Sequence, residues 1–253
     1  MRSVGVVTGA ASGIGRACAQ ALVGTVDELV LVDLRAFDSE FGQTLVADIT
    51  GDLTGLTEVV SSMGSLRSVA HAAGISPDMA DWRTILQVDL VGTALLLEAL
   101  KPLASKQTAA VCFASMASQM LIPEARPEID RVIDAPLDPG LLDALPAEVH
   151  DPAVAYAWAK RGVQRLVRRE CLHWGGRLCS ISPGIVDTAM GNQELRAHPE
   201  ITGLLDIMPV PRMASAHELA AVAAFLLSDA ASYLTGVDLL VDGGAVAAFY
   251  AGS

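Results

Sequence analysis

A tyrosine and a lysine, Tyr156 and Lys160, stand four residues apart in a segment that predicts a helix. Side chains with this spacing share one helix face, so the Lys160 ammonium would lie beside the Tyr156 phenol. A nearby positive charge lowers the pKa of a phenol from its ordinary value near ~10, which would make Tyr156 usable as an acid or base. In isolation, such a pair is more often part of a solvated helix face.

Three glycines, Gly9, Gly13 and Gly15, lie in the segment TGAASGIG between a predicted strand and a predicted helix. Without side chains at these positions, backbone amides at the helix N-terminus can approach a pyrophosphate. The alternative is an ordinary tight turn. The flanking strand and helix favour dinucleotide binding.

Asp33 ends the next predicted strand and is the acidic residue that such a site requires. A carboxylate there can accept hydrogen bonds from the ribose hydroxyls and would repel a 2′-phosphate. Ser12 is neutral and supplies no cation for that phosphate, whereas the nearby Arg35 argues the other way. The pattern predicts NAD rather than NADP; the alternative for Asp33 is a loop cap.

Strands and helices alternate along the chain. Apolar runs predict seven strands: Ser3–Thr8, Leu29–Val32, Leu45–Val46, Ser68–Ala73, Ala109–Ala114, Arg177–Ile181 and Val237–Val241. Helical spacing predicts helices over 13–23, 85–103, 152 to about 174, and 218–227. The expected fold is α/β, a Rossmann-type, doubly wound, mostly parallel seven-stranded sheet with helices on both faces and any ligand at the carboxyl ends of the strands.

Two segments depart from this alternation. Residues from about 119 to 150 hold five prolines and seven acidic residues against two arginines, which predicts an irregular insert with at most short helices before the Tyr156 helix. Residues from about 190 to 213 are rich in Leu, Ile and Met, which suits a lid over an apolar substrate, although the segment could equally belong to the core.

The sequence resembles the short-chain dehydrogenase/reductase family over nearly its whole length. The motifs that carry the likeness are TGAASGIG, the Y-x-x-x-K pair, SPGIVDTAM and YLTGVDLLVDGG, in family order. The insert lies outside the likeness. Together with VRRECLHWGG at 167–176, it makes the chain most similar to the 3α-hydroxysteroid dehydrogenase/carbonyl reductase branch. The resemblance implies one NAD-binding domain spanning residues 1–253.

The resemblance also implies four catalytic residues: Ser115, Tyr156, Lys160 and Asp89. Ser115 would orient the substrate oxygen, with a strand-end cap as its alternative role and Ser118 as the substitute serine. Asp89 stands where the family has an asparagine whose backbone carbonyl helps hold a water in a proton relay with the lysine. His71 likewise replaces a family asparagine; we expect a histidine packed beside the cofactor rather than a general base.

The cofactor contacts follow partly from the glycine turn and partly from the resemblance. Asp48 resembles the family's aspartate near the adenine, with an ordinary loop carboxylate as the alternative. The expected set is Gly9, Ser12, Gly13, Ile14, Gly15, Asp33, Leu34, Asp48, Ile49, Ala72, Ala73, Gly74, Tyr156, Lys160, Pro183, Gly184, Ile185 and Thr188. We expect no metal site.

Composition excludes several classes of protein. With 52% hydrophobic and 18% charged residues, the 253-residue chain can bury a core, which excludes global disorder. Its net charge of −12 argues against nucleic-acid binding, and its longest apolar stretch, 219–227, is too short to cross a membrane. The four cysteines lack metal-binding spacing, so we expect reduced thiols and a cytoplasmic protein.

These observations predict an NAD-dependent enzyme that interconverts a secondary alcohol and a ketone, on an apolar, bulky substrate such as a steroid or an aromatic or alicyclic ketone. Two alternatives stay open: a short-chain reductase for another carbonyl class, and a catalytically silent NAD-binding sensor or scaffold. A homo-oligomer is expected. Because the insert adjoins the Tyr156 helix, we favour a dimer built through 218–227 and the last strand over a tetramer.

Overall fold

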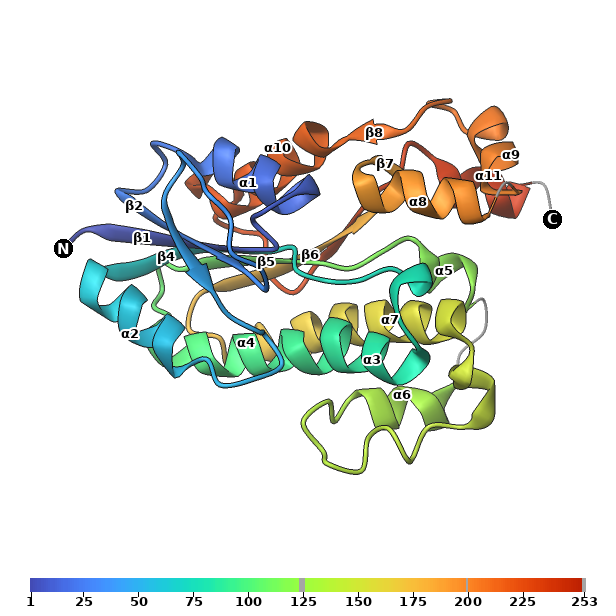
Figure 1. Ribbon diagram of the computed structural model, residues 1–253, viewed down its shortest axis with the longest axis horizontal. Coiled ribbons are helices and arrows are strands. Elements are labelled where there is room, and N and C mark those ends of the chain that lie inside the picture. The colour runs from blue at the N-terminus through green and yellow to red at the C-terminus, as the bar shows by residue number, and fades with distance from the viewer. Residues whose placement is uncertain (123–125, 199, 252–253) are drawn as a thin grey trace.

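The computed structural model describes residues 1–122, 126–198 and 200–251. Residues 123–125 of the predicted insert and residue 199 of the predicted lid lie outside this part. A parallel sheet of seven strands forms the centre, in the order β3-β2-β1-β4-β5-β6-β9 (Figure 1). The strands are β1 (Ser3–Thr8), β2 (Glu28–Asp33), β3 (Gln43–Val46), β4 (Ser65–His71), β5 (Ala109–Phe113), β6 (Arg177–Pro183) and β9 (Asp238–Val241). The predicted fold is confirmed.

Helices cover both faces of this sheet (Figure 1). One face carries α1 (Gly13–Leu22) and α10 (Ala216–Leu227); the other carries α2 (Thr54–Met63), α3 (Trp82–Leu86), the π-helical segment η2 (Gln87–Gly92), α4 (Thr93–Leu100) and α7 (Pro152–Glu170). The remaining elements are η1 (Pro77–Met79), η3 (Lys101–Leu103), α5 (Ala117–Met120), α6 (Pro127–Ile133), η4 (Ala147–His150), β7 (Val186–Asp187), α8 (Ala189–Ala197), α9 (Glu200–Ile207), β8 (Ala214–Ser215), η5 (Asp229–Ala231) and α11 (Ala245–Ala251).

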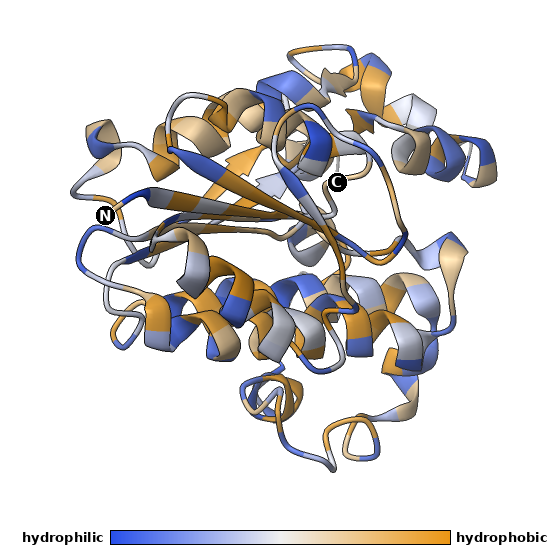
Figure 2. Ribbon diagram, turned by 60° about the vertical axis from the view of Figure 1, so that its left-hand side comes forward, coloured by the Kyte–Doolittle hydropathy of each residue, from blue (hydrophilic) through white to orange (hydrophobic). Residues whose placement is uncertain are grey.

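Successive side chains of a strand point to opposite faces of the sheet. Because helices cover both faces, the strands are buried on both sides. On β1, Val4 and Val6 join the core beneath α2, α4 and α7, while Val7 joins the core beneath α1 and α10. On β2, Leu31 belongs to the same core as Val7. Figure 2 shows the largely hydrophobic strands between two layers of amphipathic helices. This packing holds the carboxyl ends of the strands at one edge.

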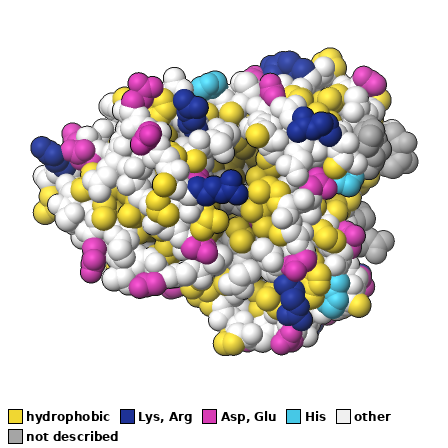
Figure 3. All heavy atoms as spheres, viewed as in Figure 1, with side chains coloured by type: hydrophobic (Ala, Val, Ile, Leu, Met, Phe, Trp, Pro, Cys, Tyr) yellow, Lys and Arg dark blue, Asp and Glu magenta, His cyan; other side chains and the backbone are white. Residues whose placement is uncertain are grey.

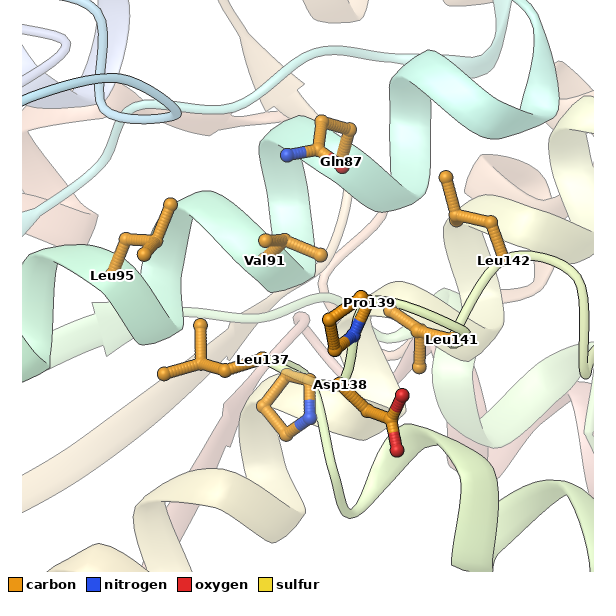
Figure 4. Close-up of a pocket in the computed structure, with 9 residues that line it drawn as sticks. Gln87, Val91, Leu95, Leu137, Asp138, Pro139, Leu141 and Leu142 are labelled. Carbon is orange, nitrogen blue, oxygen red and sulfur yellow. The ribbon is translucent and has the colours of Figure 1, made fainter.

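The predicted insert forms α6, η4 and connecting turns, and α6 packs outside α7 (Figure 1). Its buried residues Ile129, Ile133 and Val149 form a third core with Ile85 and Trp158 of α3 and α7. The loop that follows α6 leaves a cavity of about 260 Å³ against η2 and α4, where Leu137, Pro139 and Leu141 lie opposite Val91 and Leu95 (Figure 4). The insert therefore packs against the body of the domain.

Charged side chains reinforce the contact between the insert and α7. Arg161 donates to both carboxylate oxygens of Asp130, at 2.7 and 2.8 Å. Arg165 donates to both oxygens of Asp134, at 2.7 and 2.6 Å, and Arg169 also contacts Asp134. Planar, two-point pairs of this kind fix geometry as well as charge.

Several predicted boundaries differ from the structure. The Tyr156 helix ends at Glu170 instead of near Trp174, and the predicted helix over 85–103 starts at Trp82 and changes to π-helix at Gln87. Helix α2 was not predicted. No described helix is long and apolar enough to span a bilayer.

Candidate active site

A cleft of about 940 Å³ opens at the carboxyl ends of β1, β2 and β4. The chain winds outward from β1 to β3 and returns on the other side at β4, so this edge is the point at which strand order reverses. The face drawn in Figure 3 is hollowed near its middle, with hydrophobic side chains around the hollow. The predicted cofactor residues that line the cleft are Gly9, Ser12, Gly13, Ile14, Gly15, Asp33, Leu34, Asp48, Ile49, Ala72, Ala73, Gly74 and Thr188.

Two glycines close the first turn of the cleft. Gly9 has φ +67°, and a side chain there would come within 2.8 Å of the Ala72 carbonyl oxygen and the Ala73 nitrogen. At Gly15 a side chain would come within 2.1 Å of the Gly9 carbonyl oxygen, so α1 can pack against the turn only without one. The α1 N-terminus then faces the cleft, which favours an anion. These residues fit a dinucleotide pyrophosphate.

Asp33 is fixed where β2 ends. Its Oδ2 accepts from the Ala11 amide at 3.0 Å, and its Oδ1 accepts from the Arg35 amide at 3.3 Å. Arg35 is exposed and also lines the cleft. Asp48 accepts from both the amide and the hydroxyl of Thr50, at 2.8 and 2.7 Å, which forms a tight turn beside the cleft.

The predicted catalytic side chains Ser115, Tyr156 and Lys160 lie together behind Gly74. The Ser115 side chain acts on Tyr156 in the direction that lowers its pKa, and Lys160 Nζ lies 5.4 Å from the centroid of the Tyr156 ring. Lys160 is 6% exposed and donates to the Phe113 carbonyl oxygen at 3.4 Å. A side chain on Gly74 would come within 3.2 Å of Lys160 Nζ. Gly74 lines the cleft, so the lysine lies directly behind the cleft wall at this glycine.

Helix α7 positions Tyr156 and Lys160 because its start is capped. Asp151 Oδ1 accepts from the amides of Ala153 and Val154, at 2.9 and 3.1 Å, and Pro152 occupies the first turn. Farther along α7, Gln164 Nε2 contacts Ser118 Oγ at 2.9 Å and Ser182 Oγ at 2.8 Å, which ties the helix to the sheet.

Ser115 and Ser118 have different surroundings. Ser118 Oγ donates to the Ser115 carbonyl oxygen at 2.8 Å and contacts Gln164, so its hydroxyl is engaged within the protein. Ser115 Oγ accepts from the Ala117 amide at 3.2 Å, and the Ser115 side chain acts to lower the pKa of Tyr156. The geometry favours Ser115 over Ser118 as the serine beside the tyrosine.

Asp89 lies in the π-helical segment with no exposed surface. Its Oδ1 accepts from the Ile75 amide at 2.9 Å, and its Oδ2 lies 3.5 Å from Lys160 Nζ. Burial raises the pKa of Asp89, and the Lys160 charge opposes that rise. The Asp89 carbonyl oxygen accepts the Thr93 hydroxyl at 2.7 Å.

His71 is the centre of a buried hydrogen-bonded chain. Because the Thr93 hydroxyl donates to Asp89, it must accept the Nε2 proton of His71, at 2.9 Å. Nδ1 then accepts from Thr8 Oγ1 at 2.7 Å. Burial, followed by the charge of Lys160, lowers the pKa of His71 to about 3. Both ring nitrogens are engaged, which is the arrangement of a packed neutral histidine and not of a general base.

The lid segment forms α8 and α9, and it brings a carboxylate that the sequence analysis missed. Glu194 of α8 is partly buried, and its charge is among the causes that raise the pKa of Tyr156 above its ordinary value, after burial and the charge of Asp89. The Ser115 side chain opposes the rise in this pKa. The pKa of Tyr156 therefore differs from the lowered value expected beside Lys160, because burial and the charges of Asp89 and Glu194 act in the opposite direction. No sequence spacing relates Glu194 to Tyr156.

Of the cofactor residues predicted between 183 and 188, Thr188 lines the cleft and residues 183–185 do not. Thr188 caps α8, accepting from the Gly191 amide at 3.1 Å, and lines the cleft opposite Gly13. Pro183, Gly184 and Ile185 are absent from the described lining of the cleft. Within the described ranges, no group of three or more His, Cys, Asp or Glu side chains could hold a metal ion.

A family model described as enoyl-(acyl carrier protein) reductase matches residues 9–127 and 146–246. The match includes both the glycine turn and the helix of Tyr156 and Lys160. The chain belongs to the short-chain dehydrogenase/reductase family. The residues between the two matched segments, 128–145, coincide with most of the insert.

Individual members of the family are similar over most of their length. The chain is 34% identical to the short-chain dehydrogenase/reductase bsc3 of Alternaria brassicicola over 75% of this chain and 72% of that one. It is 29% identical to the 3-alpha-hydroxysteroid dehydrogenase/carbonyl reductase of Comamonas testosteroni over 96% of each. The 3-alpha-hydroxysteroid dehydrogenase of Pseudomonas sp. B-0831, solved with NADH, superposes with a TM-score of 0.79 at 27% identity, covering 99% of both chains.

As a short-chain dehydrogenase/reductase, the protein is an oxidoreductase of the alcohol dehydrogenase type that uses a nicotinamide cofactor. The glycine turn and the α1 N-terminus fit the pyrophosphate of that cofactor. Asp33 and Asp48 fit its adenosine side, because both line the same cleft.

Proposed function

We propose that this short-chain dehydrogenase/reductase interconverts a secondary alcohol and a ketone, with NAD(H) as cofactor. The observation that carries the proposal is the group formed by Ser115, Tyr156 and Lys160 directly behind Gly74 of the cleft. A hydroxyl acid or base beside a buried ammonium is what proton transfer at a carbonyl oxygen requires.

In the oxidising direction, Tyr156 Oη takes the proton of the substrate hydroxyl. The C–H bond of the carbon that bears this hydroxyl breaks, and its hydrogen leaves as a hydride with the electron pair. A C=O bond forms between that carbon and the oxygen. The bound nicotinamide supplies the acceptor for that hydride, or its donor in the reverse reaction. Ser115 holds the substrate oxygen, and Lys160 stabilises the ionised form of Tyr156, which accepts the proton in oxidation and is left behind in reduction.

The preference for NAD over NADP rests on Asp33. Its carboxylate is held by the Ala11 amide at the end of β2, where it would repel a 2′-phosphate and accept from ribose hydroxyls. Arg35 is exposed nearby and is the residue that would favour NADP. An Asp33→Ser variant should therefore gain activity with NADPH relative to NADH, whereas an unchanged ratio would contradict the role of Asp33.

We propose an apolar, bulky substrate, because apolar side chains line the cleft near Gly74. Ile75 and Met79 come from the β4 loop and η1, Met190 comes from α8, and Leu142 comes from the insert. The two hydroxysteroid dehydrogenases among the relatives support the same class.

Glu194 favours a second candidate substrate class. Glu194 is a partly buried carboxylate on α8 of the lid, and it would accept hydrogen bonds from a substrate that carries further hydroxyl groups. Polyols and hydroxylated ketones are therefore the alternative to steroid-like ketones.

A substrate panel tests the proposed function. Consumption of NADH and NADPH is measured with steroid, alicyclic and aromatic ketones and with hydroxylated ketones, and the reverse reaction with the matching alcohols. We expect turnover with NADH on the apolar ketones. Preference for hydroxylated ketones, lost in Glu194→Gln, would establish the second class; binding of NADH without turnover of any carbonyl compound would favour a sensor or scaffold.

We also propose a homodimer through α10 and β9. The face of α7 that could meet a partner is covered by α6, through the pairs of Arg161 and Arg165 with the insert. Phe225 of α10 and Leu240 of the edge strand β9 are large apolar side chains that are 45% and 38% exposed in the monomer. Light scattering should give the mass of a dimer, and a tetramer would contradict the proposal.

A further inference from the structure

Asp89 is a buried carboxylate with few hydrogen-bond partners in the described protein. It has no exposed surface, its Oδ1 accepts only the Ile75 amide, and its Oδ2 has no hydrogen-bond partner in the described protein. Lys160 Nζ lies 3.5 Å from that unpartnered oxygen. A buried charge is costly unless it is paired, so the ammonium of Lys160 is the group that makes an Asp89 carboxylate tolerable.

This pairing changes what Lys160 can do for Tyr156. Lys160 lies beside the Tyr156 ring, and Asp89 of η2 lies beside Lys160. The charges of Asp89 and of Glu194 on α8 both act to raise the pKa of Tyr156. One cation is thus set against two carboxylates, and Ser115 adds a neutral hydroxyl. A like charge close to a phenol disfavours its ionised form, which opposes the effect of the lysine.

We infer that Asp89 is a positioning residue that pairs with Lys160 and keeps Tyr156 protonated across neutral pH, which prepares the enzyme for carbonyl reduction there and for alcohol oxidation in alkaline solution. The inference deepens the proposed function and rests on it for the two directions. In reduction, the Tyr156 O–H bond breaks and its proton goes to the carbonyl oxygen as the carbonyl carbon receives the hydride from the reduced cofactor. Solvent then returns a proton to Tyr156.

A titration of the free protein tests the pairing without substrate or cofactor. The chain has three tyrosines, and Tyr233 and Tyr250 are exposed, so the ultraviolet absorbance of tyrosinate can be assigned by difference from a Tyr156→Phe variant. Tyr156 should titrate above the ordinary tyrosine value near ~10. In Asp89→Asn, which keeps the shape of the side chain, the midpoint of its titration should fall by about one pH unit or more.

Glu98→Gln is the matched control. Glu98 lies on α4, in the same helical segment as Asp89, but it is exposed and pairs with Lys101 at 3.7 Å. Removing its charge should leave the Tyr156 titration unchanged. An equal change in this control would overturn the inference, because the effect would then be one of net charge.

Kinetics give the second readout. In wild type, kcat/KM for alcohol oxidation should rise up to alkaline pH, while kcat/KM for ketone reduction stays flat through neutrality. Asp89→Asn should move both inflections to lower pH. Oxidation at neutral pH should then rise about tenfold for every pH unit by which the inflection falls.

Two results would overturn the inference: a Tyr156 titration in folded Asp89→Asn that equals that of wild type, and a wild-type Tyr156 that titrates below the ordinary tyrosine value near ~10. The second result decides the matter even if the Asp89 variant does not fold. Failure of the proposed function appears separately, as absence of turnover with an unaffected titration.

Discussion

The buried histidine predicts how stability depends on pH. His71 is 2% exposed and neutral, with Thr8 and Thr93 on its two ring nitrogens. Its pKa is lowered to about 3 in the folded protein, against an ordinary value of 6.5 for the unfolded chain. Between these values, the unfolded state binds a proton that the folded state does not, so the free energy of unfolding falls as pH falls.

The magnitude follows from the width of that interval. Each pH unit below 6.5 costs about 1.4 kcal/mol, so the loss due to His71 between pH 7 and pH 5 is about 2 kcal/mol. This is a large part of the roughly 5–15 kcal/mol that is typical of a folded protein.

Urea denaturation at pH 7 and pH 5 measures this loss in wild type and in His71→Asn. The asparagine can still hydrogen-bond to a threonine hydroxyl but does not titrate, so the variant should lose about 2 kcal/mol less than wild type over the interval. The exposed His173→Asn serves as control and should follow wild type. Equal pH dependence in wild type and His71→Asn would refute the argument from burial.

Two further substitutions test the elements that position the site. Gly15→Ala places a methyl group against the Gly9 carbonyl oxygen and should weaken NADH binding at least about tenfold, measured by quenching of protein fluorescence; unchanged affinity would contradict the tight turn. Asp151→Ala removes two hydrogen bonds from the start of α7 and should lower the free energy of unfolding by about 1 kcal/mol in urea, whereas a stability equal to wild type would show that the cap is dispensable.

Much of the fold could be predicted because local signals agree with the tertiary structure. Strand β1 is an apolar run closed by Gly9, and its predicted bounds, Ser3–Thr8, are those observed. The α7 start carries both a capping Asp151 and Pro152. Helix α2 was missed because its sequence, TGLTEVVSSM, is rich in Thr, Val and Ser, which favour helix weakly, and only Leu56 and Val60 are buried.

The site could be predicted where one motif holds the chemistry. The glycine turn and the Tyr156–Lys160 spacing are local, and the structure brings both to one edge of the sheet. The Asp89 carboxylate facing Lys160 depends on a π-helical segment, and Glu194 depends on how α8 folds back. No sequence spacing predicts either arrangement, because each involves residues from distant parts of the chain.

The most direct test of the proposed chemistry is the turnover of Tyr156→Phe with NADH and the best ketone of the panel. We predict that this variant binds NADH with the affinity of wild type and loses nearly all turnover, because the proton donor is absent while Lys160 and the glycine turn remain. A variant that binds NADH normally and keeps most of its turnover would contradict the assignment of Tyr156 as the proton donor.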